Sequence, residues 1–194
     1  MTNIALLVLE DGTVYVGTAW GATGLVVGDA DFTTEMIGYQ RPMTDPEKVG
    51  RILVMTTPHV GIGAFDENDD AQITPAGLVV REPARPHPLK KRRELVEQLQ
   101  AENVIGIAGV DTRAITRRIR AAGSMRAAIV SGQILPASAA YLEGRSRESL
   151  DLNFITEQFQ AGQAGADTAS TFDLFIDSMC AAKADHLAAE RTAL

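Results

Sequence analysis

Apolar residues occur in short runs that are separated by turn residues, a pattern that predicts a chain rich in strands. Residues 4–9 form a compact apolar run, Asp11 and Gly12 follow, and residues 14–18 then alternate between two faces. Two such runs around an Asp-Gly turn are typical of a β-hairpin. Five further β-type runs follow, at residues 25–27, 52–56, 77–80, 104–108 and 127–130.

Two segments show helical spacing instead. Residues 90–102 carry a one-sided apolar stripe of Leu95, Val96 and Leu99. Residues 112–122 place Ile115 and Ile119 four positions apart. For this second helix we expect Asp111 to be the N-cap, because its carboxylate can accept a first-turn N–H, and Gly123 to end it.

The order of these elements predicts a mixed α/β domain over residues 1–132. Residues 133–169 contain Ala, Gly and Gln stretches and are interpreted as a linker with weak structure. Residues 170–194 are expected to form a C-terminal amphipathic helix, because apolar side chains recur there at helical spacing. These side chains are Phe172, Phe175, Ile176 and Met179.

Composition and charge narrow the class of protein. Apolar residues make up 45% of the 194 residues and charged residues 22%, as in soluble globular proteins. A net charge of −7 argues against nucleic acid or an anionic membrane as the main partner. With no leader pattern or long apolar span, we expect a cytoplasmic protein. Residues 81–126, however, hold eleven Lys/Arg against five Asp/Glu, which favours an anionic ligand or an acidic protein partner.

The usual catalytic and metal-binding patterns are not found. A single cysteine, Cys180, rules out an internal disulfide and is interpreted as a packing residue. The acidic run at 66–70 lacks the glycine and the closing carboxylate of a calcium loop. The three histidines have no second ligand at helical or hairpin spacing, so we expect no metal site. No coherent set of acid, base and nucleophile is visible, so we expect no catalytic residues.

Three arginines recur on one face of the helix at residues 112–122. Arg113, Arg117 and Arg120 are spaced i, i+4 and i+7, opposite the apolar stripe. Guanidinium groups suit carboxylates or phosphates. A solvent-exposed basic face gives the same spacing, and both interpretations stay open.

Five blocks in fixed order carry a resemblance to a known family. They are LVLEDGT at 7–13, GATG at 21–24, FTTEMIGYQ at 32–40, TDP at 44–46 and IAGVDTR at 107–113. Over roughly residues 4–132 the chain resembles the N-terminal domain of the small subunit of glutamine-hydrolysing carbamoyl-phosphate synthase. The resemblance implies a swivelling-type β/β/α fold with a mixed sheet, packed on a large synthetase subunit.

The resemblance also implies which chemistry belongs elsewhere. In that family a following class I amidotransferase domain carries the cysteine nucleophile, and no matching elbow is found after Gly132. ATP and magnesium are expected on the large subunit, which makes carbamoyl phosphate for pyrimidine and arginine synthesis. No cofactor is expected in this chain. At the position where the family has a glutamine-contacting serine, this chain has Glu47.

Our preferred hypothesis is therefore a truncated paralogue with a docking role and no catalytic activity of its own. It would bind a synthetase large subunit or a separate amidotransferase. The expected interface residues are Met36, Tyr39, Gln40, Thr44, Asp45, Arg113, Arg117 and Arg120.

Two alternatives remain. The first is a stand-alone binding or regulatory module, in which the helix at 170–187 buries its apolar face on residues 4–132. The second is an independent enzyme, which would require Asp45, His59 and Asp111 to converge in one pocket. Asp45 and Asp111 are more simply interpreted as turn and cap residues.

Overall fold

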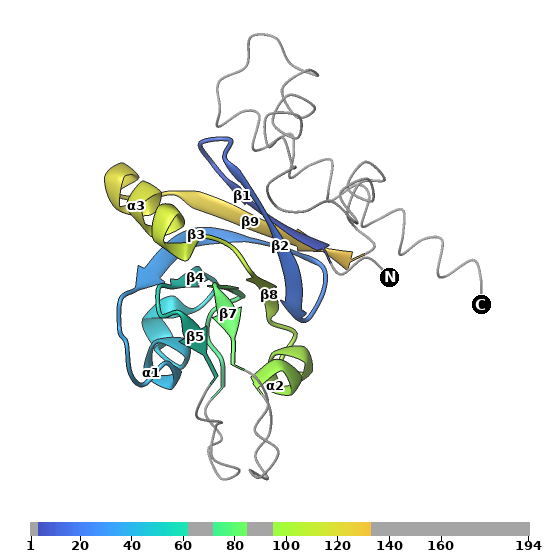
Figure 1. Cartoon of the computed structure of the whole chain (residues 1–194). Helices are drawn as coiled ribbons and strands as arrows, with labels where there is room; N and C mark the ends of the chain where they lie inside the picture. Colours follow the sequence, from blue (N-terminus) through green and yellow to red (C-terminus); the bar gives the residue numbers. More distant parts are fainter. Residues whose placement is uncertain (1–3, 62–71, 85–94, 133–194) are drawn as a thin grey trace, which may run out of the picture.

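Seven strands close into a barrel in the computed structural model, which describes residues 4–61, 72–84 and 95–132 (Figure 1). In barrel order they are β1 (Ile4–Leu9), β2 (Val14–Gly21), β8 (Ile105–Ala108), β6 (Gly77–Val80), β4 (Ile52–Met55), β3 (Leu25–Thr33) and β9 (Arg126–Ser131). Two short strands, β5 (His59–Val60) and β7 (Glu82–Pro83), form a second sheet. The helices are α1 (Gln40–Met43), the 3-10 helix Pro46–Lys48, α2 (Leu95–Ala101) and α3 (Thr112–Ala122).

The barrel mixes antiparallel and parallel pairing. β1 pairs antiparallel with β2 and with β9, and Leu7 lies opposite both Tyr15 and Ile129. β9 also pairs antiparallel with β3, and β2 with β8. The remaining pairs, β3 with β4, β4 with β6 and β6 with β8, are parallel. The described part of the chain is therefore a mixed α/β domain dominated by sheet.

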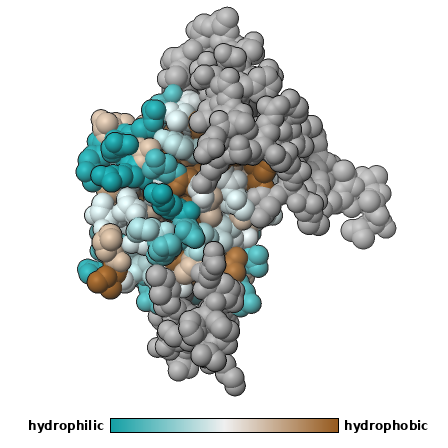
Figure 2. Space-filling view, viewed as in Figure 1, coloured by the Kyte–Doolittle hydropathy of each residue, from teal (hydrophilic) through white to brown (hydrophobic). Residues whose placement is uncertain are grey.

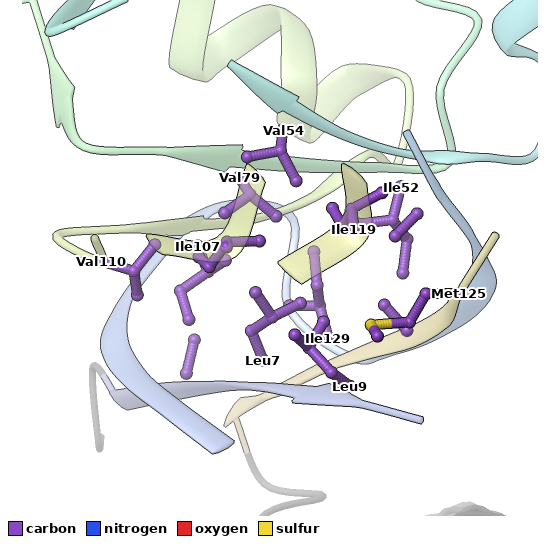
Figure 3. Close-up of a cluster of buried hydrophobic side chains, with 14 of the residues drawn as sticks. Leu7, Leu9, Ile52, Val54, Val79, Ile107, Val110, Ile119, Met125 and Ile129 are labelled. Atoms are coloured by element: carbon purple, nitrogen blue, oxygen red, sulfur yellow. The ribbon is translucent and has the colours of Figure 1, made fainter. Parts of the chain in front are cut away.

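One apolar cluster fills the barrel interior. Alternate residues of each strand point inward, as the two-residue period of a strand requires. Leu7, Val54 and Ile107 are at most 1% exposed, and Ile115 and Ile119 of α3 join them in the same cluster. Figure 3 shows Leu7, Val54 and Ile119 pointing toward one another in the centre. The packing of α3 on this interior fixes the helix against β3 and β4.

A second apolar cluster, which we call the outer cluster, lies outside the barrel wall. It is formed by the opposite faces of β4, β6 and β8, where Leu53, Met55 and Leu78 are fully buried. Met43 of α1 and Leu99 of α2 belong to the same cluster. Figure 1 shows α1 and α2 on this side of the molecule, away from β1 and β9. These strands are thus buried on both faces, which explains their continuous apolar sequence.

Most of the expected elements are confirmed. The hairpin of β1 and β2 forms around Asp11 and Gly12, and α3 spans the expected residues. The Asp111 carboxylate accepts the N–H of Ala114 at 3.0 Å, and Gly123 ends the helix with a φ of +79°. The linker at 133–169 and the helix at 170–194 lie outside the described residues. The swivelling-type classification remains a prediction.

Some features differ from expectation. The strand expected at residues 25–27 is β3, which continues to Thr33 because its later residues pair with β4. The short helix α1 and the sheet of β5 and β7 were not expected, since two to four residues are too few to show a period.

Close approach between β2 and β8 generates a stability prediction. A Cβ on Gly106 would collide with the carbonyl oxygen of Trp20, whereas a Cβ on Gly77 would meet only side-chain atoms, at 3.1–3.2 Å. We therefore expect Gly106→Ala to lower the free energy of unfolding by about 1–3 kcal/mol, and Gly77→Ala to cost less. Urea denaturation followed by circular dichroism measures both. Equal losses would contradict this account of the β2–β8 contact.

Candidate functional site

The loop between β3 and α1 presents two large apolar side chains to solvent. Met36 is 71% exposed and Ile37 is 91% exposed. The backbone around them is held in place: the Glu35 amide donates to Thr33 Oγ1 at 3.2 Å, and Thr57 Oγ1 donates to the Met36 carbonyl at 3.4 Å. Among the described residues these are the two most exposed large apolar side chains, ahead of Val49 at 67%.

The expected interface residues that follow this loop have mainly structural contacts. Tyr39 is half-buried against the outer cluster. Thr44 Oγ1 donates to the Gln40 carbonyl at 3.1 Å, where α1 ends. The Asp45 carboxylate accepts a hydrogen bond from the Glu47 amide at 3.0 Å, and the backbone carbonyl of Asp45 accepts one from Thr74 Oγ1 at 2.6 Å. The interpretation of Asp45 as a turn residue is confirmed, and Glu47 lies exposed beside it.

An ion pair fixes the 3-10 helix on β3. Lys48 Nζ lies 2.7 Å from Asp31 Oδ2, and both side chains are about three-quarters buried. Burial alone would raise the pKa of Asp31, but the hydrogen bonds from Lys48 and from the Phe32 amide outweigh it and lower the pKa below its ordinary value. The segment that carries Met36 and Ile37 is thus attached to the barrel at both of its ends.

The three expected arginines lie exposed on α3, as the helical spacing predicts. Arg113, Arg117 and Arg120 all face solvent, while Ile115 and Ile119 are buried. Figure 2 shows hydrophilic residues gathered over α3. The guanidinium carbon of Arg120 lies 5.2 Å from the centre of the Phe32 ring, within range of a cation–π interaction. This contact places one arginine of α3 over β3, just before the Met-Ile loop.

A fourth arginine of this helix, missed in the sequence, forms an ion pair. Arg118 donates from Nη1 to Asp11 Oδ2 at 2.9 Å and so connects α3 to the β1–β2 turn. Burial raises the pKa of Tyr15, and Arg118 partly offsets that rise. The sequence did not indicate this contact, because only the folded barrel brings α3 and the β1–β2 turn together.

The residues expected of an independent enzyme have different partners. Asp45 closes a turn with Glu47, and Asp111 caps α3. His59 Nδ1 lies 3.6 Å from Glu82 Oε2 across the β5–β7 pair, and both side chains are more than half exposed. Within the described ranges, no group of three or more His, Cys, Asp or Glu is placed to hold a metal ion. No helix there is long and apolar enough to span a bilayer.

Comparison with known proteins identifies the family. Residues 7–129, which run from within β1 to within β9, match the carbamoyl-phosphate synthase small chain, CPSase domain. The chain belongs to this family. The carbamoyl phosphate synthase small chain of Streptomyces avermitilis is 49% identical over 135 residues, which cover 68% of this chain and 36% of the relative. That of Xanthomonas axonopodis pv. citri is 44% identical over 137 residues.

The chain thus spans about a third of the length of these small-chain relatives. The small chain of Mycobacterium leprae matches further along, at 37% identity over 177 residues, 89% of this chain and 46% of the relative. A match over that share of the chain necessarily extends beyond Gly132.

The Asp31–Lys48 pair predicts a pH-dependent stability. Because the pKa of Asp31 is lowered in the folded state, its contribution is complete above the pKa of the unfolded chain and is lost as the pH falls through the folded pKa. We expect Asp31→Asn to cost about 1 kcal/mol at pH 7 and progressively less from about pH 5 to pH 3. Urea denaturation of both proteins across this range measures the difference. A difference that does not change with pH would contradict the ionic origin.

The cap of α3 gives a second prediction. Asp111→Ala removes the acceptor for the Ala114 amide and should cost about 1 kcal/mol of unfolding free energy. Asp111→Ser retains a capping oxygen and should cost clearly less. Thermal denaturation of the two variants makes the comparison, and an equal loss in both would mean that Asp111 stabilises the chain in another way.

Proposed function

We propose that the protein is a non-catalytic docking subunit that binds a carbamoyl-phosphate synthase large subunit through its β3–α1 loop. The observation that carries this proposal is the exposure of Met36 and Ile37 on an anchored loop. Covering exposed apolar side chains with a partner is favourable, because each of them releases water when it is buried. Membership of the small-chain family supplies the class of partner.

The anchored backbone of the loop also favours docking. The Lys48–Asp31 ion pair and the hydrogen bonds of Thr33, Thr44 and Thr57 already fix the backbone on either side of it. Little conformational freedom is then lost on association. A separate amidotransferase is the other partner that the family offers, and it would meet the same loop beside Glu47.

The arginine face of α3 supports a role in partner choice. Arg113, Arg117 and Arg120 are exposed and lie on an acidic chain of net charge −7. Exposed charges of one sign steer association and exclude wrongly charged partners more than they add affinity. We therefore assign these arginines to recognition of an acidic strip on the partner, and the Met-Ile pair to the affinity itself.

Nothing in the described part of the chain supports catalysis by this protein alone. Asp45, His59 and Asp111 do not share a partner, and Glu47 stands where the family resemblance places a serine that contacts glutamine. A carboxylate at that point accepts hydrogen bonds only, whereas the serine hydroxyl both donates and accepts. The complex would then be expected to use ammonia rather than glutamine as its nitrogen source.

Mixing the full chain with the large subunit from the same cell tests the proposal. Size-exclusion chromatography at micromolar concentration should show co-elution, with carbamoyl phosphate formed from ammonia and not from glutamine. The double variant Met36→Asp with Ile37→Asp should weaken binding at least tenfold. Ala101→Asp adds a charge at an exposed position of α2, on another part of the surface, and should leave binding unchanged.

Two results would overturn the proposal. Unaltered binding by the double variant would remove the loop from the interface, and glutamine-dependent activity of the isolated chain would remove the non-catalytic role. Circular dichroism of each variant confirms that the barrel remains folded before binding is compared.

A further inference from the structure

The outer face of four neighbouring strands carries two rows of apolar side chains. The pairing of β2, β1, β9 and β3 places residues directly opposite one another, and opposite residues share a face of the sheet. One row is Val16, Leu6, Val130 and Leu25, and the next is Val14, Val8, Ala128 and Val27. We call these eight residues the outer β9 face.

The outer β9 face points away from the barrel interior. Leu7, Leu9 and Ile129 are inward residues of the interior cluster, so their neighbours Leu6, Val8, Ala128 and Val130 point outward. None of the eight residues belongs to either apolar cluster of the described residues. Figure 1 shows α1 and α2 on the other side of the molecule.

The centre of this face is nevertheless closed to solvent. Leu6 is 1% exposed, Val8 is 5% exposed, and Ala128 and Val130 are 0% exposed. At its rim Val27 is 39% exposed and Val14 is 4% exposed. An apolar patch with so dry a centre is a covered patch, whereas the described helices α1 and α2 cover a different part of the barrel.

A row of charge bounds the face at one end. Glu10 and Arg126 form an ion pair at 2.9 Å, and Asp29 lies opposite Arg126 on the next strand. The apolar surface is therefore a patch with a charged boundary at one end. One amphipathic element could cover it with its apolar side and keep its polar groups in water.

We propose that residues 170–187 of the same chain cover the outer β9 face in cis. The chain leaves the barrel from the end of β9, the strand at the centre of this face. Phe172, Phe175, Ile176 and Met179 recur at helical spacing in this segment and form one apolar stripe. Residues 133–169 reach far beyond the width of four strands, since an extended chain covers about 3.3 Å per residue.

This inference goes beyond the docking role and does not rest on it. A face covered in cis is withheld from partners, so the barrel would be a self-contained unit with the β3–α1 loop free for docking. The two surfaces can then fail independently: the first is tested within one chain, the second only with a partner present.

Cys180, the single cysteine of the chain, provides a probe inside the proposed covering segment. Val16→Cys, Leu25→Cys and Val27→Cys each place a second thiol at the rim of the outer β9 face in the otherwise intact chain. A disulfide requires Cα atoms within about 7 Å, so it reports proximity directly. Ile37→Cys is the matched control, because it is the more exposed position and lies in the β3–α1 loop.

Mild oxidation of each purified variant, followed by non-reducing electrophoresis and peptide mass spectrometry, gives the result. We expect an intramolecular disulfide to Cys180 in at least one rim variant, and at least tenfold less in the Ile37→Cys control. In the unaltered chain, Cys180 should react with a thiol reagent at least tenfold more slowly than in urea.

Other outcomes overturn the proposal. Disulfides formed between two molecules, in a yield that rises with concentration, would assign the face to a second copy. Equal cross-linking of the control, or no intramolecular disulfide in any rim variant together with a thiol that reacts as fast as in urea, would show that the segment does not cover this face.

Discussion

The closed barrel forces each of its strands to present an apolar face inward, and the other features of the structure depend on that constraint. Leu7, Ile107 and Ile129 from different walls meet in one interior cluster. Because side chains alternate along a strand, fixing the inward residues also fixes which residues point outward. The outer cluster and the outer β9 face both follow from this alternation, and the arginine face of α3 lies opposite the isoleucines that α3 buries in the interior cluster.

The same constraint separates stability from recognition. Most interior and outer-cluster residues lie on the strands and on the helices packed against them, whereas the exposed Met36 and Ile37 lie on a connection that the barrel only holds in position. Loops on a rigid scaffold can change their sequence without disturbing the core. Glu47 illustrates this freedom, since it occupies an exposed position on a turn whose geometry is set by Asp45 and Thr74.

Local patterns in the sequence were sufficient to predict most elements, because each carries its own period or cap. α3 was bounded correctly by Asp111 and Gly123, and the hairpin by its Asp-Gly turn. The closure of the barrel was not predictable, since Leu7 and Ile129 meet only through pairing between the first and last described strands. Arg118 was missed for the same reason: its partner Asp11 lies on a distant turn. The resemblance to the small chain indicated candidate residues, but their exposure and contacts required the fold.

The position of β9 has a consequence for how the protein folds during its synthesis on the ribosome. This strand lies between β1 and β3, yet it is the last of the described strands to be synthesised. Until it emerges, the hairpin of β1 and β2 has no partner for its free edge and the interior stays open to water. Pairing across so long a sequence separation is slow. The barrel therefore completes itself only after nearly all of its own residues have left the exit tunnel.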